Sequence, residues 1–321
     1  MFVDLSGPAL LEHVSEQTAP ADFDEFWEGT LAEARSFDLD VTVEPVASTL
    51  RTVDVYDVTF SGFGGHRIRA WLRLPHGARG PLPTMVQFVG YGGGRGEAEE
   101  NLFWASSGFA HLHMDTRGQG ATWSRGATPD VQTAGPRFPG MMTAGIQSRE
   151  EYYYRRVITD AVRAIETAAG LPQVDASRIV AIGGSQGGGL ALAATALSPL
   201  VSELVAYVPF LCDFPRAIQI TDNDPYKEIS RYLAVHRSEE SAVLETLRYF
   251  DGVNFARRAS APAWFTTALM DPICPPSTVV GAYNAYAGPK QLTVYTHNSH
   301  EGGGIDDDIR IARALQERFG L

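Results

Sequence analysis

Cysteine is scarce in this sequence, and long apolar runs are absent. Only Cys212 and Cys274 occur among 321 residues, too few for a disulfide framework, which makes a reducing compartment the default expectation. No run of about 20 apolar residues could form a transmembrane helix. The first residues also lack the basic start of a signal peptide. We therefore expect a cytoplasmic protein with no membrane partner.

Positive charge is also in short supply. The chain has 26 lysines and arginines against 38 aspartates and glutamates, which gives a formal net charge of -12. Nucleic acids and anionic membranes bind basic surfaces, so this balance argues against both as partners. Hydrophobic residues make up 44% of the chain. This fraction is enough for a sizeable core and too high for a disordered chain.

The spacing of apolar residues predicts the secondary structure. Residues 22–37 have the spacing of an amphipathic helix. Residues 52–60 and 66–75 alternate with a period of two around a glycine-rich turn, which predicts an antiparallel hairpin. Buried strands are predicted at residues 83–90, 109–115, 178–184, 204–210, 263–269 and 291–296. Helices are predicted at residues 97–106, 151–169, 186–197, 276–287 and 305–319.

This alternation of strands and helices predicts an α/β fold. About eight strands would form a mostly parallel sheet with helices on both faces, led by the antiparallel hairpin. We expect residues 1–321 to form a single domain, with an N-terminal helical extension over about residues 1–50. Residues 211–251 are predicted to be an insertion over the C-terminal edge of the strands, where open α/β sheets bind ligands. The long connection 120–149 is also typical of a functional or interfacial loop.

One serine lies in a glycine-rich turn. Residues 183–187, GGSQG, match the pattern G-x-S-x-G between a predicted strand and a predicted helix. The turn has two interpretations: a corner that packs the strand against the helix, or a nucleophile elbow that exposes the hydroxyl group of Ser185. The strand–turn–helix context favours the elbow, since the small neighbours leave a substrate room to approach.

A serine nucleophile needs a base and an acid, and candidates for both follow in the chain. Asp271 comes directly after the predicted strand 263–269, and His300 follows the last predicted strand. This order of serine, acid and histidine is that of hydrolases with a nucleophile elbow. His300 would take the proton of Ser185, and Asp271 would orient His300 and stabilise its charge. His297 is the alternative base, whereas Asp251 is disfavoured as the acid because it precedes its strand.

Two backbone N–H groups are candidates for an oxyanion hole. Gln186 follows the nucleophile at the start of the helix, and Tyr91 lies in VGYGGGRG after the third predicted strand. The glycines could also form a flexible turn, but a phosphate loop is disfavoured because no G-K-[ST] sequence ends the run. Tyr91 and Phe210 are candidate substrate-binding residues, with Trp123 and Tyr226 as further aromatic candidates.

Two other motifs are interpreted as structural. His111 and His113 share one face of a strand and could hold a metal ion, but the sequence places no third ligand beside them. We therefore predict neither a metal site nor a cofactor. Arg117, in DTRGQG after the same strand, is predicted to clamp carboxylate or carbonyl groups rather than to take part in catalysis.

Four motifs together resemble those of the acetyl xylan esterase and cephalosporin C deacetylase family, carbohydrate esterase family 7. They are RGQG at residues 117–120, GGSQGG at 183–188, LMDPICPP at 269–276 and HE at 300–301. The segment DFDEFW near the N-terminus is also similar to that family's opening. One departure is visible: the family commonly has a histidine before the tyrosine, in the sequence HGY, whereas this chain has Val89-Gly90 before Tyr91.

The resemblance implies an α/β-hydrolase fold and a serine esterase that removes acetyl groups from small esters, such as acetylated xylo-oligosaccharides and cephalosporin C. It implies Ser185, Asp271 and His300 as the triad, with Tyr91 and Gln186 as backbone oxyanion donors. It also implies a cytoplasmic hexamer whose active sites face an internal cavity.

Two alternative functions compete with this expectation. The first is another activity on the same triad, namely an esterase of different acyl preference, a lactonase or a peptidase. The second is a non-catalytic binding module, which is disfavoured because no member of the triad is missing.

Overall fold

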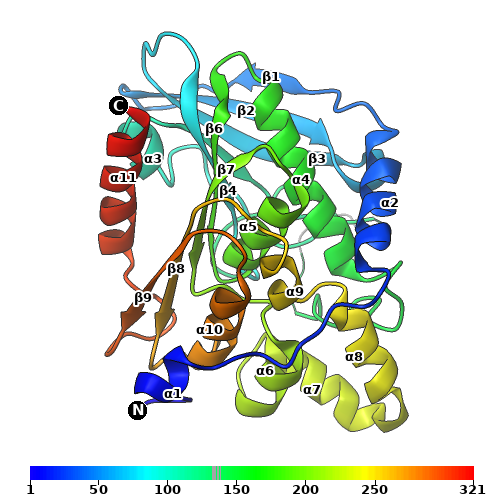
Figure 1. The fold of residues 1–321 in the computed structure, drawn as a ribbon. Coiled ribbons are helices and arrows are strands. Elements are labelled where there is room, and N and C mark those ends of the chain that lie inside the picture. The colour runs from blue at the N-terminus through cyan, green and yellow to red at the C-terminus, as the bar shows by residue number, and fades with distance from the viewer. Residues whose placement is uncertain (132–134, 136, 138) are drawn as a thin grey trace.

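A computed structural model describes residues 1–131, 135, 137 and 139–321. The strands in this part of the chain are β1 (Thr42–Pro45), β2 (Val53–Ser61), β3 (Arg67–Pro75), β4 (Leu82–Phe88), β5 (Ala110–Met114), β6 (Val174–Gly184), β7 (Val201–Tyr207), β8 (Ala263–Ala268) and β9 (Lys290–Tyr295). They form one nine-stranded sheet in the order β1-β2-β3-β5-β4-β6-β7-β8-β9 (Figure 1). The pairs β1–β2, β2–β3 and β3–β5 are antiparallel, and all the others are parallel.

Helices cover both faces of the sheet, which is the layered arrangement of the α/β-hydrolase fold (Figure 1). They are α1 (Gly7–Leu11), α2 (Phe23–Arg35), α3 (Phe103–Ser106), α4 (Tyr153–Gly170), α5 (Gln186–Leu197), α6 (Phe214–Ile220), α7 (Tyr226–Val235), α8 (Glu240–Arg248), α9 (Gly252–Ala256), α10 (Pro276–Ala285) and α11 (Ile305–Phe319). None of the described helices is both long enough and apolar enough to cross a membrane.

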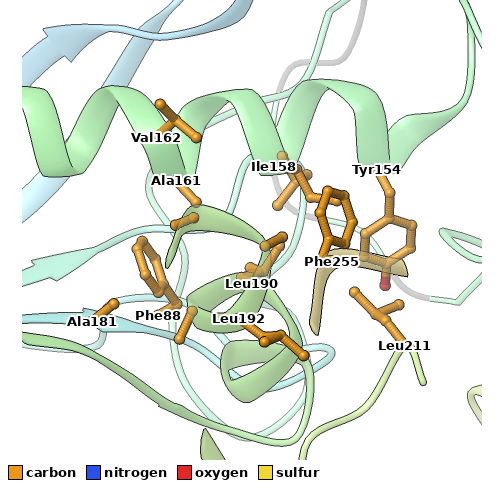
Figure 2. Packing of buried hydrophobic residues seen from close by; sticks show 14 of the residues in the cluster. Phe88, Tyr154, Ile158, Ala161, Val162, Ala181, Leu190, Leu192, Leu211 and Phe255 are labelled. Carbon is orange, nitrogen blue, oxygen red and sulfur yellow. The ribbon is translucent and has the colours of Figure 1, made fainter. Parts of the chain in front are cut away.

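The two faces of the sheet have separate cores, because successive residues of a strand point to opposite faces. On one face, Phe88 of β4 and Ala181 of β6 pack beneath α4 and α5. Figure 2 shows Ile158 of α4 pointing toward Leu190 of α5 in this core. On the other face, Met85, Val180, Ile182 and Val205 pack with Trp104 of α3 and with Ile311 and Leu315 of α11.

Most of the predicted elements are confirmed. The hairpin pairs from Val53↔Pro75 to Ser61↔Arg67, and the six later strands lie where the apolar runs predicted them. The edge strand β1 was missed, since all four of its residues are exposed and give no apolar signal. The helix predicted over residues 97–106 is wrong in its first half: α3 begins only at Phe103. Asn101 adopts a positive φ of 52°, which a right-handed helix does not allow.

Two glycines bring β4, β6 and α5 into direct backbone contact. A Cβ atom on Gly183 would lie 2.3 Å from the carbonyl carbon of Gly187, and one on Gly187 would lie 2.1 Å from the carbonyl oxygen of Phe88. Both distances are far below van der Waals contact. Only glycine at these two positions lets α5 begin immediately after β6 while it packs against the end of β4.

We predict that Gly187→Ala lowers the free energy of unfolding by about 3 kcal/mol, because the added methyl group forces backbone segments apart. Gly29→Ala is the matched control. Gly29 lies inside α2 with no atom within 4 Å of its Cβ direction, and the substitution should stabilise the protein by about 0.5–1 kcal/mol. Urea unfolding measures both effects. Wild-type stability of Gly187→Ala would contradict the packing argument.

Candidate active site

Ser185 occupies a strained position at the junction of β6 and α5. Its backbone has φ 56° and ψ -123°, a combination that side-chain-bearing residues rarely adopt and that clusters at functional sites. The surrounding backbone holds it there, because the Ser185 N–H donates to the carbonyl of Tyr207 and the Ser185 carbonyl accepts from the N–H of Phe210, both at 2.9 Å. Ser185 lines a cavity, which is where an elbow presents its hydroxyl group.

Asp271 and His300 form a hydrogen-bonded pair on two neighbouring loops. Asp271 follows β8 and His300 follows β9, and His300 Nδ1 lies 2.8 Å from Asp271 Oδ2. Asp271 is fully buried, and its other oxygen accepts the N–H groups of Ile273 and Cys274 at 2.8 and 2.9 Å. With Nδ1–H donating to the carboxylate, the imidazole Nε2 is left as the atom that can accept a proton.

One cavity of about 670 Å³ contains both Ser185 and His300. A volume of this size is typical of a site for a small molecule. The predicted insertion contributes Asp224 and Pro225 to the wall, and the connection 120–149 contributes Trp123. Described residues of both segments therefore contribute to the wall of this cavity, and residues 132–134, 136 and 138 of the connection lie outside the described part of the chain.

The two predicted oxyanion donors lie beside Ser185. Gln186 begins α5, and the first N–H groups of a helix have no partner within it. Tyr91 lies in the turn after β4 and lines the cavity. The hydroxyl group of Tyr91 donates to Glu228 of α7 at 2.8 Å and accepts the N–H of Met141 at 3.0 Å. Burial and the nearby Glu228 carboxylate raise the pKa of Tyr91, so the hydroxyl group stays protonated.

A buried amide network behind these donors was missed by the sequence analysis. Gln119 Oε1 accepts the N–H of Gly92 at 2.7 Å, and Gln119 Nε2 donates to Gln186 Oε1 at 2.8 Å. Gln186 Nε2 in turn donates to the carbonyl of Val89 at 3.1 Å. The network therefore ties the loop that carries Tyr91 to the first residue of α5. The glutamine of RGQG was the available signal, but nothing in its sequence neighbourhood indicates these partners.

The aromatic predictions are partly wrong. Phe210 does not line the cavity: it is fully buried in the core, with its ring 4.2 Å from that of Tyr226, which is buried as well. Val208, directly after β7, lines the cavity, whereas Phe210, two residues further on, packs into the core. Trp123 does line the cavity, and its indole N–H donates to the carbonyl of Tyr91 at 2.9 Å.

The alternative acid and base lie elsewhere. His297 is exposed and does not line the cavity. Asp251 is fully buried at the start of α9, where it accepts N–H groups of Asp213, Phe214 and Val253. Asp251 therefore caps the N-terminus of α9 and has a structural role.

The remaining motif residues hold structural positions. Arg117 is fully buried and bonds Asp160 with two nitrogens, at 2.5 and 2.7 Å, which confirms the predicted clamp. His111 and His113 stack on β5 with ring centroids 5.5 Å apart, and His111 Nε2 contacts Gln87 Oε1 at 2.8 Å. Within the described ranges, side chains with metal-ligand spacing occur at Asp271, Cys274 and His300, two of which already bond to each other.

The sequence profile of the family described as acetyl xylan esterase (AXE1) matches residues 1–317. The chain belongs to the acetyl xylan esterase family. Acetyl xylan esterases hydrolyse acetyl esters, and this member is accordingly a carboxylic ester hydrolase.

Solved structures and a curated protein agree with this assignment. An acetyl xylan esterase from Paenibacillus sp. R4 is 38% identical with a TM-score of 0.90, over 97% of this chain and 99% of that one. Acetyl Xylan Esterase 1 from Thermoanaerobacterium sp. JW/SL YS485 is 32% identical with a TM-score of 0.88, over 98% and 99%. Acetyl esterase Axe7A from Xylanibacter ruminicola is 31% identical over 297 residues, 91% of this chain but 66% of that protein. The chain thus spans just under two thirds of the length of that relative.

We predict that Gln119→Leu lowers kcat about tenfold or more, because the link from Gly92 through Gln119 to Gln186 is lost and the predicted oxyanion donors become less well aligned. Gln119→Glu is the matched variant, since its carboxylate still accepts the N–H of Gly92. It should retain more activity than the leucine variant. Steady-state rates of the folded proteins measure the difference. Equal rates in the two variants would show that the bond to Gly92 does not position the loop.

Proposed function

We propose that this chain removes acetyl groups from small oxygen esters, with Ser185 as nucleophile, His300 as base and Asp271 as the acid that orients His300. The observation that carries the proposal is the 2.8 Å contact between His300 and buried Asp271, in the wall of the cavity that Ser185 lines from its strained elbow. The order of the three residues and the family membership support the same assignment.

The proposed reaction uses these groups in two steps. His300 Nε2 takes the proton of Ser185 as its oxygen attacks the ester carbonyl, and the N–H groups of Gln186 and Tyr91 stabilise the oxyanion. His300 then gives the proton to the departing alcohol, which leaves an acetyl-Ser185 intermediate. A water molecule, deprotonated by His300, hydrolyses this intermediate and releases acetate.

The proposed substrates are acetylated xylo-oligosaccharides and compounds of the cephalosporin C type. A cavity of about 670 Å³ has room for a sugar or a bicyclic alcohol beside the acetyl group. We extend the proposal to a cytoplasmic hexamer on the family resemblance. The two buried, unpaired cysteines are in keeping with a reducing compartment.

The nucleophile is tested by substitution. Ser185→Ala should lower kcat for 4-nitrophenyl acetate by a factor of about 10⁴ or more, because no other group forms the acyl intermediate. The wild-type enzyme should release a burst of one equivalent of 4-nitrophenol where deacylation limits turnover. Ser36→Ala, at an exposed position at the end of α2, is the control and should leave both readouts unchanged. A substantial residual rate in Ser185→Ala would refute the assignment.

The acyl preference is tested with 4-nitrophenyl esters of acetate, propionate, butyrate and hexanoate. We expect kcat/KM to fall about tenfold or more beyond propionate, since an acyl group that does not fit costs binding energy with each added methylene. Constant or rising values along the series would instead indicate an esterase for longer acyl chains. A lactone and a peptide anilide complete the panel, and faster turnover of either would favour the corresponding alternative activity.

A further inference from the structure

The cavity continues along one face of the sheet, well beyond Ser185. Gln87 pairs with Ile182 on one side and with His113 on the other, so these three side chains share a face. Ile182 precedes Ser185 by three residues, which places this end of the cavity about 10 Å back along the strand. We call this space the α3–α11 compartment; its lining includes Gln87, Trp104, His113, Tyr207, Asp307 and Asp308.

Two helices close the compartment. Trp104 of α3 and Ile311 of α11 belong to the core cluster on this face, and Gln316 of α11 donates to the carbonyl of Ser107, directly after α3, at 2.9 Å. Figure 1 shows α3 and α11 next to each other on the same side of the sheet. The compartment is therefore a recess between packed elements that opens toward Ser185.

The proposed reaction places the alcohol half of the ester next to this recess. His300 must protonate the departing alcohol oxygen, so the alcohol lies beside His300 when the ester bond breaks. The loop that carries His300 leads directly into α11, and Glu301, Asp307 and Asp308 of this segment line the cavity. The alcohol thus faces the wall formed by α11.

The inner end of the recess offers an unused hydrogen-bond donor. His113 is 3% exposed and lines the cavity. Its Nδ1 lies 3.5 Å from a guanidinium nitrogen of Arg73, which can only donate, so the proton of the neutral ring sits on Nε2. Burial and the charges of Arg73 and Arg95 hold the pKa of His113 to about 3, which keeps the ring neutral. Among the described residues, Nε2 has no hydrogen-bond partner, and it is free to donate to a ligand.

The outer wall of the recess carries negative charge. The cavity is lined by the carboxylates of Asp224, Glu301, Asp307 and Asp308, and its described lining contains no lysine or arginine. Arg231 pairs with Asp224 and Arg310 pairs with Asp307.

Asp308 differs from these two paired carboxylates, because it makes no ion pair with a described residue. It lies beside the hydroxyl group of Tyr207. Burial and the neighbouring Asp307 raise the pKa of Asp308 to about 6, so the group is ionised at pH 8.

We propose that the α3–α11 compartment binds the alcohol half of the substrate and that Asp308 is a specificity-determining residue, which favours uncharged, hydroxyl-bearing alcohols over anionic ones. Asp308 accepts hydrogen bonds from alcohol hydroxyl groups, and His113 donates one. A carboxylate on the alcohol would meet the unpaired charge of Asp308 in a partly desolvated recess, where like charges repel strongly. The inference rests on the proposed esterase function and ranks its substrates: neutral acetylated sugars stand above cephalosporin C, whose alcohol half carries a carboxylate.

The test uses three acetate esters of nearly the same shape at pH 8. They are 3,3-dimethylbutyl acetate (neutral), acetylcholine (cationic) and 4-acetoxy-2,2-dimethylbutanoate (anionic). We expect kcat/KM for the anionic ester to lie about tenfold or more below that for the neutral ester, and the cationic ester to match or exceed the neutral one. Equal values for the anionic and neutral esters would overturn the proposal, and this comparison needs only the wild-type protein.

Variants assign the effect to Asp308. Asp308→Asn should reduce the discrimination, measured as the ratio of kcat/KM for the neutral ester to kcat/KM for the anionic ester, about tenfold. Asp308→Glu should restore the discrimination, which a structural role alone would not predict. Asp306→Asn is the control, because Asp306 is exposed on the same helix turn and does not line the cavity. Unchanged discrimination in Asp308→Asn would overturn the role of this residue.

The same data separate this proposal from the proposed function. Absence of hydrolysis with all three esters and with 4-nitrophenyl acetate would refute the esterase function itself. Hydrolysis of the neutral ester without rejection of the anionic one would leave the esterase function standing and refute only the charge selection.

Discussion

The arrangement of the site depends on one steric constraint, the backbone contact of Gly183, Gly187 and Phe88. A Cβ atom at either glycine would overlap main-chain atoms. Because it is absent, α5 can begin directly after β6 and close against the end of β4. This junction sets Ser185 in its strained conformation and brings the first turn of α5 alongside the Tyr91 loop. The two interpretations of the glycine-rich turn are therefore compatible: the same turn packs the strand against the helix and exposes the hydroxyl group of Ser185.

Buried polar groups hold this junction in place. The side chains of Gln119 and Gln186 connect Gly92, Val89 and α5, and nearby Arg117 is paired with Asp160. Groups of this kind are costly to bury unless their hydrogen bonds are made, but once satisfied they favour a single geometry. A site that must align two backbone donors with a nucleophile gains from such rigidity, since catalytic positioning tolerates errors of only about 0.5 Å.

The sequence predicted correctly those features that a short stretch of neighbouring residues determines. Period-two alternation and apolar runs located all strands except β1, whose exposed residues carry no pattern. The order of Ser185, Asp271 and His300 was readable because each follows its own strand. Contacts that depend on how distant segments meet were not readable. Phe210 was a candidate pocket residue as an aromatic at the end of a predicted strand, yet it is buried in the core. The α3–α11 compartment joins residues from β4, β5, β7 and α11, and no local pattern indicates that they share a cavity.

Glu228, on α7, links residues 211–251 to two other segments of the chain. One of its oxygens accepts the hydroxyl group of Tyr91, and the other accepts the N–H of Met142 in the long connection after β5. A single carboxylate on α7 thus joins three segments that are far apart in the sequence. If residues 211–251 were replaced by the corresponding segment of a relative without this carboxylate, the cavity wall would change. At the same time, the loop that carries Tyr91 would lose its contact with α7. A change of the cavity wall in this region is therefore expected to alter the catalytic rate as well, unless the Glu228 carboxylate is kept.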